Sequence, residues 1–573
     1  MTELDLLLHN ARIADLFRLR TFVGWVGVAA GCFVYVEGGP PPPDLRARRT
    51  LDLDGHYLVP GLLDAHMHIE SSLVTPRRFA EAVLPFGTTA VLADPHEVAN
   101  VAGEAGVRWM IAASQGLDLR VFTAIPSCVP ATAPELEWTS AVFQADVVER
   151  LAAEPSVIAL GEVMDYQGLL GHNDRLPPMV EAARRAGLRV EGHIPTLRGM
   201  PLSRYLAHGI TSDHTLTTPE KLLEQLSKGV AVMLQAKSIT PQNIAAVNGL
   251  PDRSAILLVT DDVEPSLLVG GHLNRIVALA VEAGLPPLEA LASASLRPAR
   301  YLGLHDMGAI APGYRADFLV MDGLAAFPPA EVYVAGRQVA AGGALTRPQA
   351  NQMPPPPPFP PVPGPFSPAD FRLDPADRPA AQVWANAVTL DNDRNTLTRL
   401  EQIPLPLEEG YALFQEGDGL NLVAVFAREG PSRTVGVLKN AHLNHGAFAS
   451  SLAHDSHNLL VVGREARSMA VAANAVHQQG GGLAVARGEE VLARLPLPLF
   501  GLLSDEPVRQ VADALADIEA ALRAAGMTHQ RPFLMLSILA LSVSPYYKFT
   551  DKGVVDTEAR RLLPPWEHPH APA

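Results

Sequence analysis

The pattern of apolar and polar positions changes several times along the chain and divides it into segments. From residue 61 to about residue 302, short apolar runs alternate with stretches of helical periodicity. The runs include residues 90–93, 157–160 and 255–259, and helix candidates include residues 178–186 and 219–226. Strands that are apolar throughout are typical of parallel sheets buried on both faces. An α/β fold with a (β/α)8 catalytic barrel over residues 61–302 is therefore predicted.

The segments on either side of this region have a different pattern. Residues 1–60 and 303–352 are patterned as short strands and turns, and we expect them to form one small composite β domain. Residues 22–36 carry no charge, but this run is shorter than the ~20 residues that span a bilayer. Acidic residues precede it and glycines follow it, so it predicts buried strands rather than a targeting segment.

Proline dominates residues 353–368, which predicts an extended, semi-rigid linker. Residues 369–573 mix strand and helix patterns and predict a C-terminal α+β domain. Within it, the polar stretch 454–458 contains His454 and His457. We expect this stretch to help the domain close the active site, rather than to act directly in catalysis.

Composition narrows the class of protein. The 573 residues suit two or three domains, and 48% hydrophobic content argues against general disorder. A net charge of −16 does not suit a nucleic-acid binder. Only two cysteines, Cys32 and Cys128, are present, which excludes a disulfide framework and a cysteine-based zinc site. We expect a reduced, cytoplasmic protein that binds neither nucleic acid nor membrane and forms a homodimer.

Candidate metal ligands begin with His66 and His68, at the end of the strand predicted to start at Leu62. Alternate side chains of a strand share a face, so the two imidazoles can bind one divalent ion. Further His and acidic residues end later apolar runs, and the carboxyl ends of barrel strands meet at one face. These further candidates are Glu162, His193, His214 and Asp261.

The expected arrangement is a centre for two divalent ions. The first would be bound by His66, His68 and Asp261, and the second by His193 and His214.

Glu162 could bridge both ions through its two carboxylate oxygens. Asp261 would also act as the general base for the attacking water, with Asp262 as the alternative base. Zinc, manganese and iron all suit these ligand types.

These motifs resemble the amidohydrolase superfamily, and within it the bacterial adenine deaminases. The resemblance covers nearly the whole chain and includes HMHIESS at residues 66–72, DPHE at 94–97, GEVM at 161–164, SDH at 212–214, AHDSHN at 453–458 and LSDEP at 503–507. It implies a (β/α)8 barrel with a flanking β domain and the hydrolysis of adenine to hypoxanthine and ammonia. It also implies manganese or iron as the metal, and a small purine as the substrate.

The DPHE stretch adds two catalytic candidates. His96 and Glu97 could move protons or bind the purine, with Glu97 protonating a ring nitrogen. The alternative is that Asp94 caps a helix and Glu97 is solvated. Asp94, Glu70 and Ser71 are further candidates, either for contacts with the substrate or for the orientation of metal ligands. Glu70 and Ser71 would orient His66 or His68 through hydrogen bonds.

Three stretches depart from the pattern of the family. Residues 191–193 read EGH where Asp-Gly-His is usual. Residues 235–238 read QAKS where Arg-Glu-Gly-Ser is usual, and residues 263–265 read VEP where a His-Pro loop is usual. The substrate could therefore be another aminopurine or a cyclic amide. A non-catalytic binding protein on the same fold is the second alternative, and the intact ligand set argues against it.

Overall fold

The computed structural model describes residues 3–172, 174–350, 352–377, 379–393 and 395–568. The chain forms two compact units. Unit 1 consists of residues 1–95, 110–126 and 144–354. Unit 2 consists of residues 96–109, 127–143 and 355–573.

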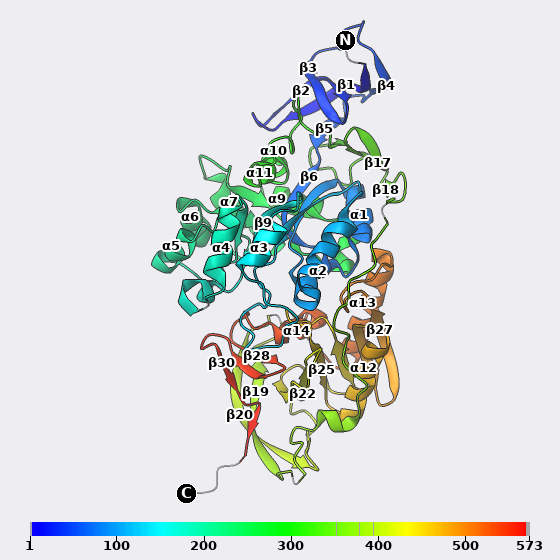
Figure 1. The fold of residues 1–573 in the computed structure, drawn as a ribbon. Helices are drawn as coiled ribbons and strands as arrows, with labels where there is room; N and C mark the ends of the chain where they lie inside the picture. The colour runs from blue at the N-terminus through cyan, green and yellow to red at the C-terminus, as the bar shows by residue number, and fades with distance from the viewer. Residues whose placement is uncertain (1–2, 173, 351, 378, 394, 569–573) are drawn as a thin grey trace. The chain divides into compact units, whose positions relative to one another are not determined.

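Unit 1 contains a nine-stranded sheet whose strands come from residues 4–60 and from residues 318–345 (Figure 1). Its strands are β1 (Leu4–Asp15), β2 (Arg20–Ala29), β3 (Cys32–Gly38), β4 (Ala47–Asp52), β5 (Tyr57–Pro60), β15 (Phe318–Met321), β16 (Glu331–Val334), β17 (Arg337–Ala341) and β18 (Ala344–Leu345). Strand β5 pairs with β15 across more than 250 positions of sequence, with Val59 opposite Leu319. The uncharged run at residues 22–36 thus lies in the hairpin of β2 and β3.

Parallel strands alternate with helices in the rest of unit 1. A six-stranded sheet contains β6 (Leu62–His68), β7 (Thr88–Ala93), β8 (Arg120–Ile125), β9 (Val157–Val163), β10 (Arg189–Gly192) and β14 (Asp261–Asp262). A three-stranded sheet contains β11 (Ser212–Asp213), β12 (Ala231–Leu234) and β13 (Ile256–Leu258). Both sheets are parallel throughout, and together with the helices they form an α/β fold with a curled parallel sheet.

Helices connect these strands, as the alternation of patterns predicts. The helices of this region are α1 (Pro76–Val83), α3 (Ala145–Leu151), α4 (Leu176–Arg185), α5 (Gly199–Ala207), α6 (Pro219–Ser227), α7 (Pro241–Asn248), α8 (Pro265–Leu268), α9 (Leu273–Glu282), α10 (Pro287–Ser293) and α11 (Leu296–Tyr301) (Figure 1). Alternate strand residues, including Leu63, Ala90, Ala159 and Leu257, are buried together as one core. This core fixes the strand ends that carry the candidate ligands.

Unit 2 is centred on a ten-stranded sheet. Its strands are β19 (Gln382–Leu390), β20 (Thr398–Glu408), β21 (Tyr411–Ala412), β22 (Leu420–Phe426), β23 (Arg433–Lys439), β24 (Ala447–Ser450), β25 (Leu459–Gly463), β26 (Gly482–Arg487), β27 (Glu490–Pro496) and β31 (Trp566–Glu567). A second, three-stranded sheet contains β28 (Tyr547–Thr550), β29 (Gly553–Asp556) and β30 (Arg561–Leu563). The helices are α12 (Ala466–Gln478), α13 (Val508–Ala524) and α14 (Pro532–Ser537).

The proline-rich segment has no helix or strand up to Ser367, in keeping with extended chain. It is nevertheless held against α12, because His477 Nδ1 donates to the carbonyl of Val362 and Phe366 exchanges two hydrogen bonds with Asn474. Val362 is buried in the core of unit 2. The apolar residues between the prolines therefore attach this segment to unit 2.

Unit 2 also takes two pieces from the middle of the chain. Helix α2 (His96–Ser114) begins in unit 2 and ends in unit 1, and residues 127–143 also belong to unit 2. Among the described residues, no helix has both the length and the apolar content needed to cross a membrane.

Candidate metal centre

His66 and His68 lie on β6, and both side chains are buried. Strand β14 pairs in parallel with β6, which places Asp261 opposite Met67, between the two histidines. Asp261 Oδ1 lies 3.8 Å from His66 Nε2 and 3.5 Å from His68 Nε2. The three side chains therefore form one compact ligand group.

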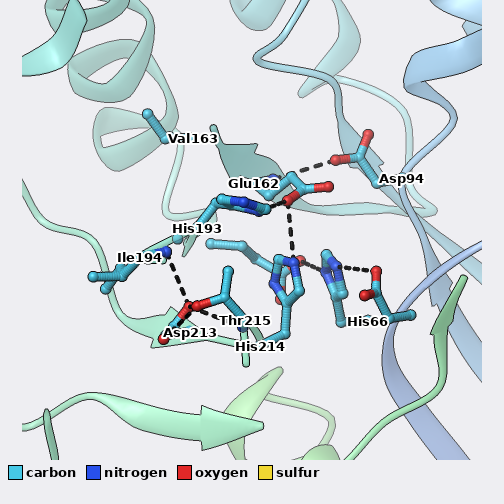
Figure 2. Close-up of polar contacts among 12 residues, drawn as sticks. His66, Asp94, Glu162, Val163, His193, Ile194, Asp213, His214 and Thr215 are labelled. Atoms are coloured by element: carbon cyan, nitrogen blue, oxygen red, sulfur yellow. Dashed lines mark hydrogen bonds and ion pairs between the residues drawn. The ribbon is translucent and has the colours of Figure 1, made fainter. Parts of the chain in front are cut away.

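Glu162, near the end of β9, directs its two oxygens at different histidines (Figure 2). Oε1 lies 3.4 Å from His68 Nε2, whereas Oε2 lies 3.2 Å from His214 Nε2 and 2.6 Å from His193 Nδ1. The rings of His66 and His214 stack with centroids 3.9 Å apart. All six predicted ligands therefore come together, with the Glu162 carboxylate between two groups of histidines.

This donor set fits divalent metal ions. Imidazole nitrogens and carboxylate oxygens suit zinc, manganese and iron. Burial, and then the neighbouring His214 and His68, lower the pKa of His66 to about 3, so its imidazole is neutral, as a ligand must be. Among the residues that the structure describes, His66 Nε2 has no hydrogen-bond partner although it is buried. This nitrogen is available to a metal ion.

The charges of the centre are balanced within the protein. Burial opposes ionisation of Glu162, but His214 and His193 hold the pKa of its carboxyl well below the usual range. The carboxylates of Glu162 and Asp261 overcome the effect of burial on His214 and raise its pKa to about 9. Without metal, a protonated imidazole therefore supplies positive charge that a bound cation would replace.

Two hydrogen bonds orient the histidines of β6. His66 Nδ1 donates to Glu191 Oε2 at 2.9 Å, and His68 Nδ1 donates to the carbonyl oxygen of Asp94 at 3.0 Å. Each bond turns the Nε2 atom of its ring toward the centre. Glu191 was not among the predicted site residues. It lies on β10, two residues before the candidate ligand His193.

The predicted orienting residues make other contacts. Ser71 Oγ donates to Asp262 Oδ1 at 2.6 Å, and Glu70 is buried in the turn after β6. The Asp94 carboxylate accepts from the backbone N–H of Glu162 at 3.2 Å, and Pro95 is the residue at the N-terminus of α2. The Asp94 side chain therefore contacts the backbone of Glu162.

Gln235, one of the departures from the family pattern, contacts the predicted base. Its Nε2 donates to Asp261 Oδ2 at 2.8 Å and to the carbonyl of His214 at 2.9 Å. Burial opposes ionisation of Asp261, but His214 and a bond from His68 hold its pKa well below the usual range. The carboxylate is ionised and can accept a proton.

A second buried network lies behind His193 and His214 (Figure 2). Asp213 Oδ1 accepts from the backbone N–H groups of Ile194 and Thr215, both at 3.0 Å. Each of these N–H groups belongs to the residue that directly follows a candidate ligand. Lys221 Nζ lies 2.9 Å from Asp213 Oδ2.

The two catalytic candidates of the DPHE motif belong to unit 2. His96 and Glu97 form the first turn of α2, and both are buried. Within unit 2, His96 Nε2 lies 3.9 Å from Asp455 Oδ1, and Glu97 Oε1 lies 3.5 Å from His454 Nδ1. The polar stretch at residues 454–458 is therefore in contact with the DPHE motif.

Comparison with known proteins relates both units to one family. Residues 57–339 match the Amidohydrolase family, and residues 395–561 match the Adenine deaminase C-terminal domain. Adenine deaminase of Desulfatibacillum aliphaticivorans is 37% identical over 96% of this chain and 95% of its own length. Adenine deaminase 2 of Carboxydothermus hydrogenoformans is 36% identical over 98% of this chain and 96% of its own length. The chain belongs to the adenine deaminase family of the amidohydrolases.

Proposed function

We propose that this protein catalyses the hydrolytic deamination of adenine to hypoxanthine and ammonia. The observation that carries the proposal is the group of four histidines and two carboxylates, buried apart from the partly exposed His193, in a chain that matches adenine deaminases along nearly its whole length. Water replaces the amino group on the six-membered ring, and ammonia leaves.

Two divalent ions would be bound by His66, His68 and Asp261, and by His193 and His214, with Glu162 reaching both sets. When bound, such ions supply the positive charge that acidifies water at neutral pH. Manganese is our first candidate, with iron and zinc as alternatives.

Asp261 is our candidate for the general base. Its ionised carboxylate accepts the proton of the attacking water and passes it toward the leaving ammonia. The bond from Gln235 holds Oδ2 in place, which leaves Oδ1 directed at His66 and His68.

Glu97 is our candidate for the acid that protonates a purine ring nitrogen. Such an acid must be protonated near neutral pH, and burial of a carboxyl favours that state. We assign His96 to proton transfer beside it.

The fold proposed for catalysis is a closed (β/α)8 barrel over residues 61–302. The two parallel sheets and their connecting helices support this assignment. We propose the composite β domain at residues 1–60 and 303–352, and a C-terminal domain at residues 369–573. A homodimer stays a prediction.

The departures at Gln235 and Val263 favour one alternative within the same chemistry, another aminopurine as the substrate. Gln235 contacts the proposed base directly, so its replacement of the usual arginine changes the centre itself.

The deciding experiment measures ammonia release by manganese-loaded protein from adenine, adenosine, other aminopurines and cyclic amides. We expect adenine to react, hypoxanthine to form, and adenosine to remain intact. Chelator-treated protein, with metal content checked by elemental analysis, should be inactive until manganese or iron is added. Release from adenosine, or from a non-purine alone, would overturn the assignment of adenine.

A further inference from the structure

A cluster of buried polar side chains lies within unit 2, around Glu97. Glu97 comes from α2, and His454, Asp455 and His457 come from the segment between β24 and β25. Ligating atoms of Glu97, His454 and His457 all lie within 4.8 Å of one another. Asp455 Oδ1 lies 3.6 Å from His454 Nδ1.

Two members of the cluster have polar atoms without a hydrogen-bond partner among the described residues. His457 is fully buried, and among the described residues neither of its ring nitrogens has a hydrogen-bond partner. Asp455 is 2% exposed, and its Oδ2 has no partner among the same residues. Buried polar atoms of this kind are uncommon in native proteins, and a bound water, ion or ligand can supply the missing hydrogen bonds.

The backbone of His457 adds a second indication. Its φ angle is 53°, in the left-handed region that residues other than glycine seldom adopt. Such conformations concentrate at sites that hold ligands. The protein therefore maintains an unfavourable conformation to place this imidazole.

The chemistry of the two side chains is complementary to a free purine. Burial, and then the nearby His454, Arg428 and His96, hold the pKa of His457 well below its usual range. The neutral imidazole offers one N–H donor and one nitrogen acceptor. A carboxylate oxygen can accept the N–H of the five-membered purine ring. A nucleoside has no N–H at that position, because the sugar replaces it.

A metal ion is the competing occupant, since the same side chains are metal-ligand types. Arg428 argues against it. This guanidinium is buried and donates from Nε to the backbone carbonyl of His457 at 2.6 Å, which adds positive charge beside the cluster. A neutral base is therefore better suited to the cluster than a further cation.

We propose that Asp455 and His457 recognise the free purine base: Asp455 Oδ2 accepts the N–H of its five-membered ring, and His457 donates to a ring nitrogen. The inference rests on the proposed function, in which Glu97 of the same cluster protonates the ring. It makes these two residues determinants of the preference for a base over a nucleoside.

The first test is calorimetric binding of hypoxanthine and 9-methylhypoxanthine to the manganese-loaded full chain. We expect the methyl compound to bind at least about tenfold more weakly, because it lacks the N–H. Asp455→Asn should weaken hypoxanthine binding and reduce this ratio toward one. Asp374→Asn is the matched control, since Asp374 is buried in unit 2 but both its oxygens accept backbone hydrogen bonds. An unchanged ratio in Asp455→Asn would overturn the proposal.

The second test uses His457→Gln, with metal content as an additional readout. We expect hypoxanthine binding to weaken at least about tenfold while two ions per chain are retained. The control is His529→Gln, because both ring nitrogens of His529 are hydrogen bonded. Loss of an ion from His457→Gln, or unchanged hypoxanthine binding, would refute the assignment.

Thermal unfolding of each variant shows whether it is folded, and His457→Asn and Asp455→Ser replace any variant that is not. The two proposals fail separately. An unreactive wild-type protein on adenine contradicts the proposed function. A reactive wild-type protein with an unchanged binding ratio in Asp455→Asn contradicts this inference alone.

Discussion

At the scale of single residues, the centre depends on carboxylates whose charge is set by their neighbours. Asp261 and Glu162 are both buried, yet nearby histidines keep both ionised. At Glu191, burial outweighs the nearby His214 and His68 and raises the pKa of the carboxyl to about 8. The same residue type therefore has different roles in the same centre.

The role of Asp261 leads to the first prediction. Asp261→Asn keeps one ligand oxygen but cannot accept a proton, so kcat for adenine should fall at least about a hundredfold. Steady-state kinetics on manganese-loaded protein measures the effect. Asp262→Asn is the control, because Asp262 is exposed and its carboxylate accepts from Ser71. A nearly normal rate in Asp261→Asn would assign the base to Asp262 or Glu97 instead.

At the scale of elements, helix α6 supports the centre through one buried ion pair. Lys221 of α6 bonds to Asp213, and Asp213 holds the backbone after His193 and after His214. Gln225, one turn further along α6, also donates to Asp213, at 2.7 Å. The helix thereby fixes two loops that come from different strands.

The second prediction follows from this arrangement. Asp213→Asn should reduce retention of one of the two metal ions, because the loops after His193 and His214 lose a charged acceptor. It should also lower the free energy of unfolding by about 3–5 kcal/mol, the usual cost of breaking a buried pair. Metal analysis after dialysis and urea denaturation give the two values. Glu224→Gln, which breaks the ion pairs of the more exposed Glu224 on α6 with Lys228 and Arg198, is the control. Full metal retention in Asp213→Asn would contradict the prediction.

The third prediction concerns β28, where Lys548 is fully buried and donates to the carbonyl of Thr396. Burial lowers the pKa of this amine to about 7 from an ordinary 10.5. Between these two values the unfolded chain binds the proton and the folded protein does not, so the free energy of unfolding should rise with pH.

Lys548→Met removes the titrating amine, so the free energy of unfolding of the variant should lack this rise with pH. It should be more stable than wild type near pH 7, by at least about 1 kcal/mol. Urea denaturation at pH 7 and pH 9.5 measures both effects. Lys552→Met is the control, because Lys552 is exposed. A wild-type protein with equal stability at both pH values would show that Lys548 keeps its ordinary pKa.

At the scale of the whole molecule, unit 2 includes residues that the sequence assigns to the barrel region. Within this unit, the backbone N–H of Trp138 donates to Asp551 Oδ1 at 2.7 Å, and Ser542 Oγ donates to Glu137 Oε1 at 2.7 Å. Residues 127–143 therefore depend on side chains more than 400 positions away.

The fourth prediction is that removal of residues 369–573 abolishes adenine deamination. The truncated chain keeps His96 and Glu97 but loses His454 and Asp455, which they contact. Circular dichroism and metal content establish whether the remaining chain is folded, and ammonia release gives its rate. A folded truncated protein with unchanged kcat/KM would contradict a role of the C-terminal region in catalysis.

Local patterns predicted much of this architecture, and their limits are physical. Strand periodicity places His66 and His68 on one face of β6, and the strand-end rule brings Glu162 and Asp261 to them. Side-chain contacts between positions far apart in the sequence cannot be predicted from such local patterns.

The bond from His66 to Glu191 joins positions 125 residues apart, and no periodicity identifies it. The contact of Gln235 with Asp261 is of the same kind. The sequence pattern also does not indicate that residues 96–109 and 127–143 belong to unit 2, because this depends on distant packing partners.

The interleaved course of the chain has a consequence for how this family can be recombined. Unit 2 is encoded in three separate stretches, two of which interrupt the sequence of unit 1. Exchange of the C-terminal region alone between two homologous genes would join residues 355–573 of one parent to residues 96–109 and 127–143 of the other. Viable chimaeras should therefore be those that inherit all three stretches from the same parent.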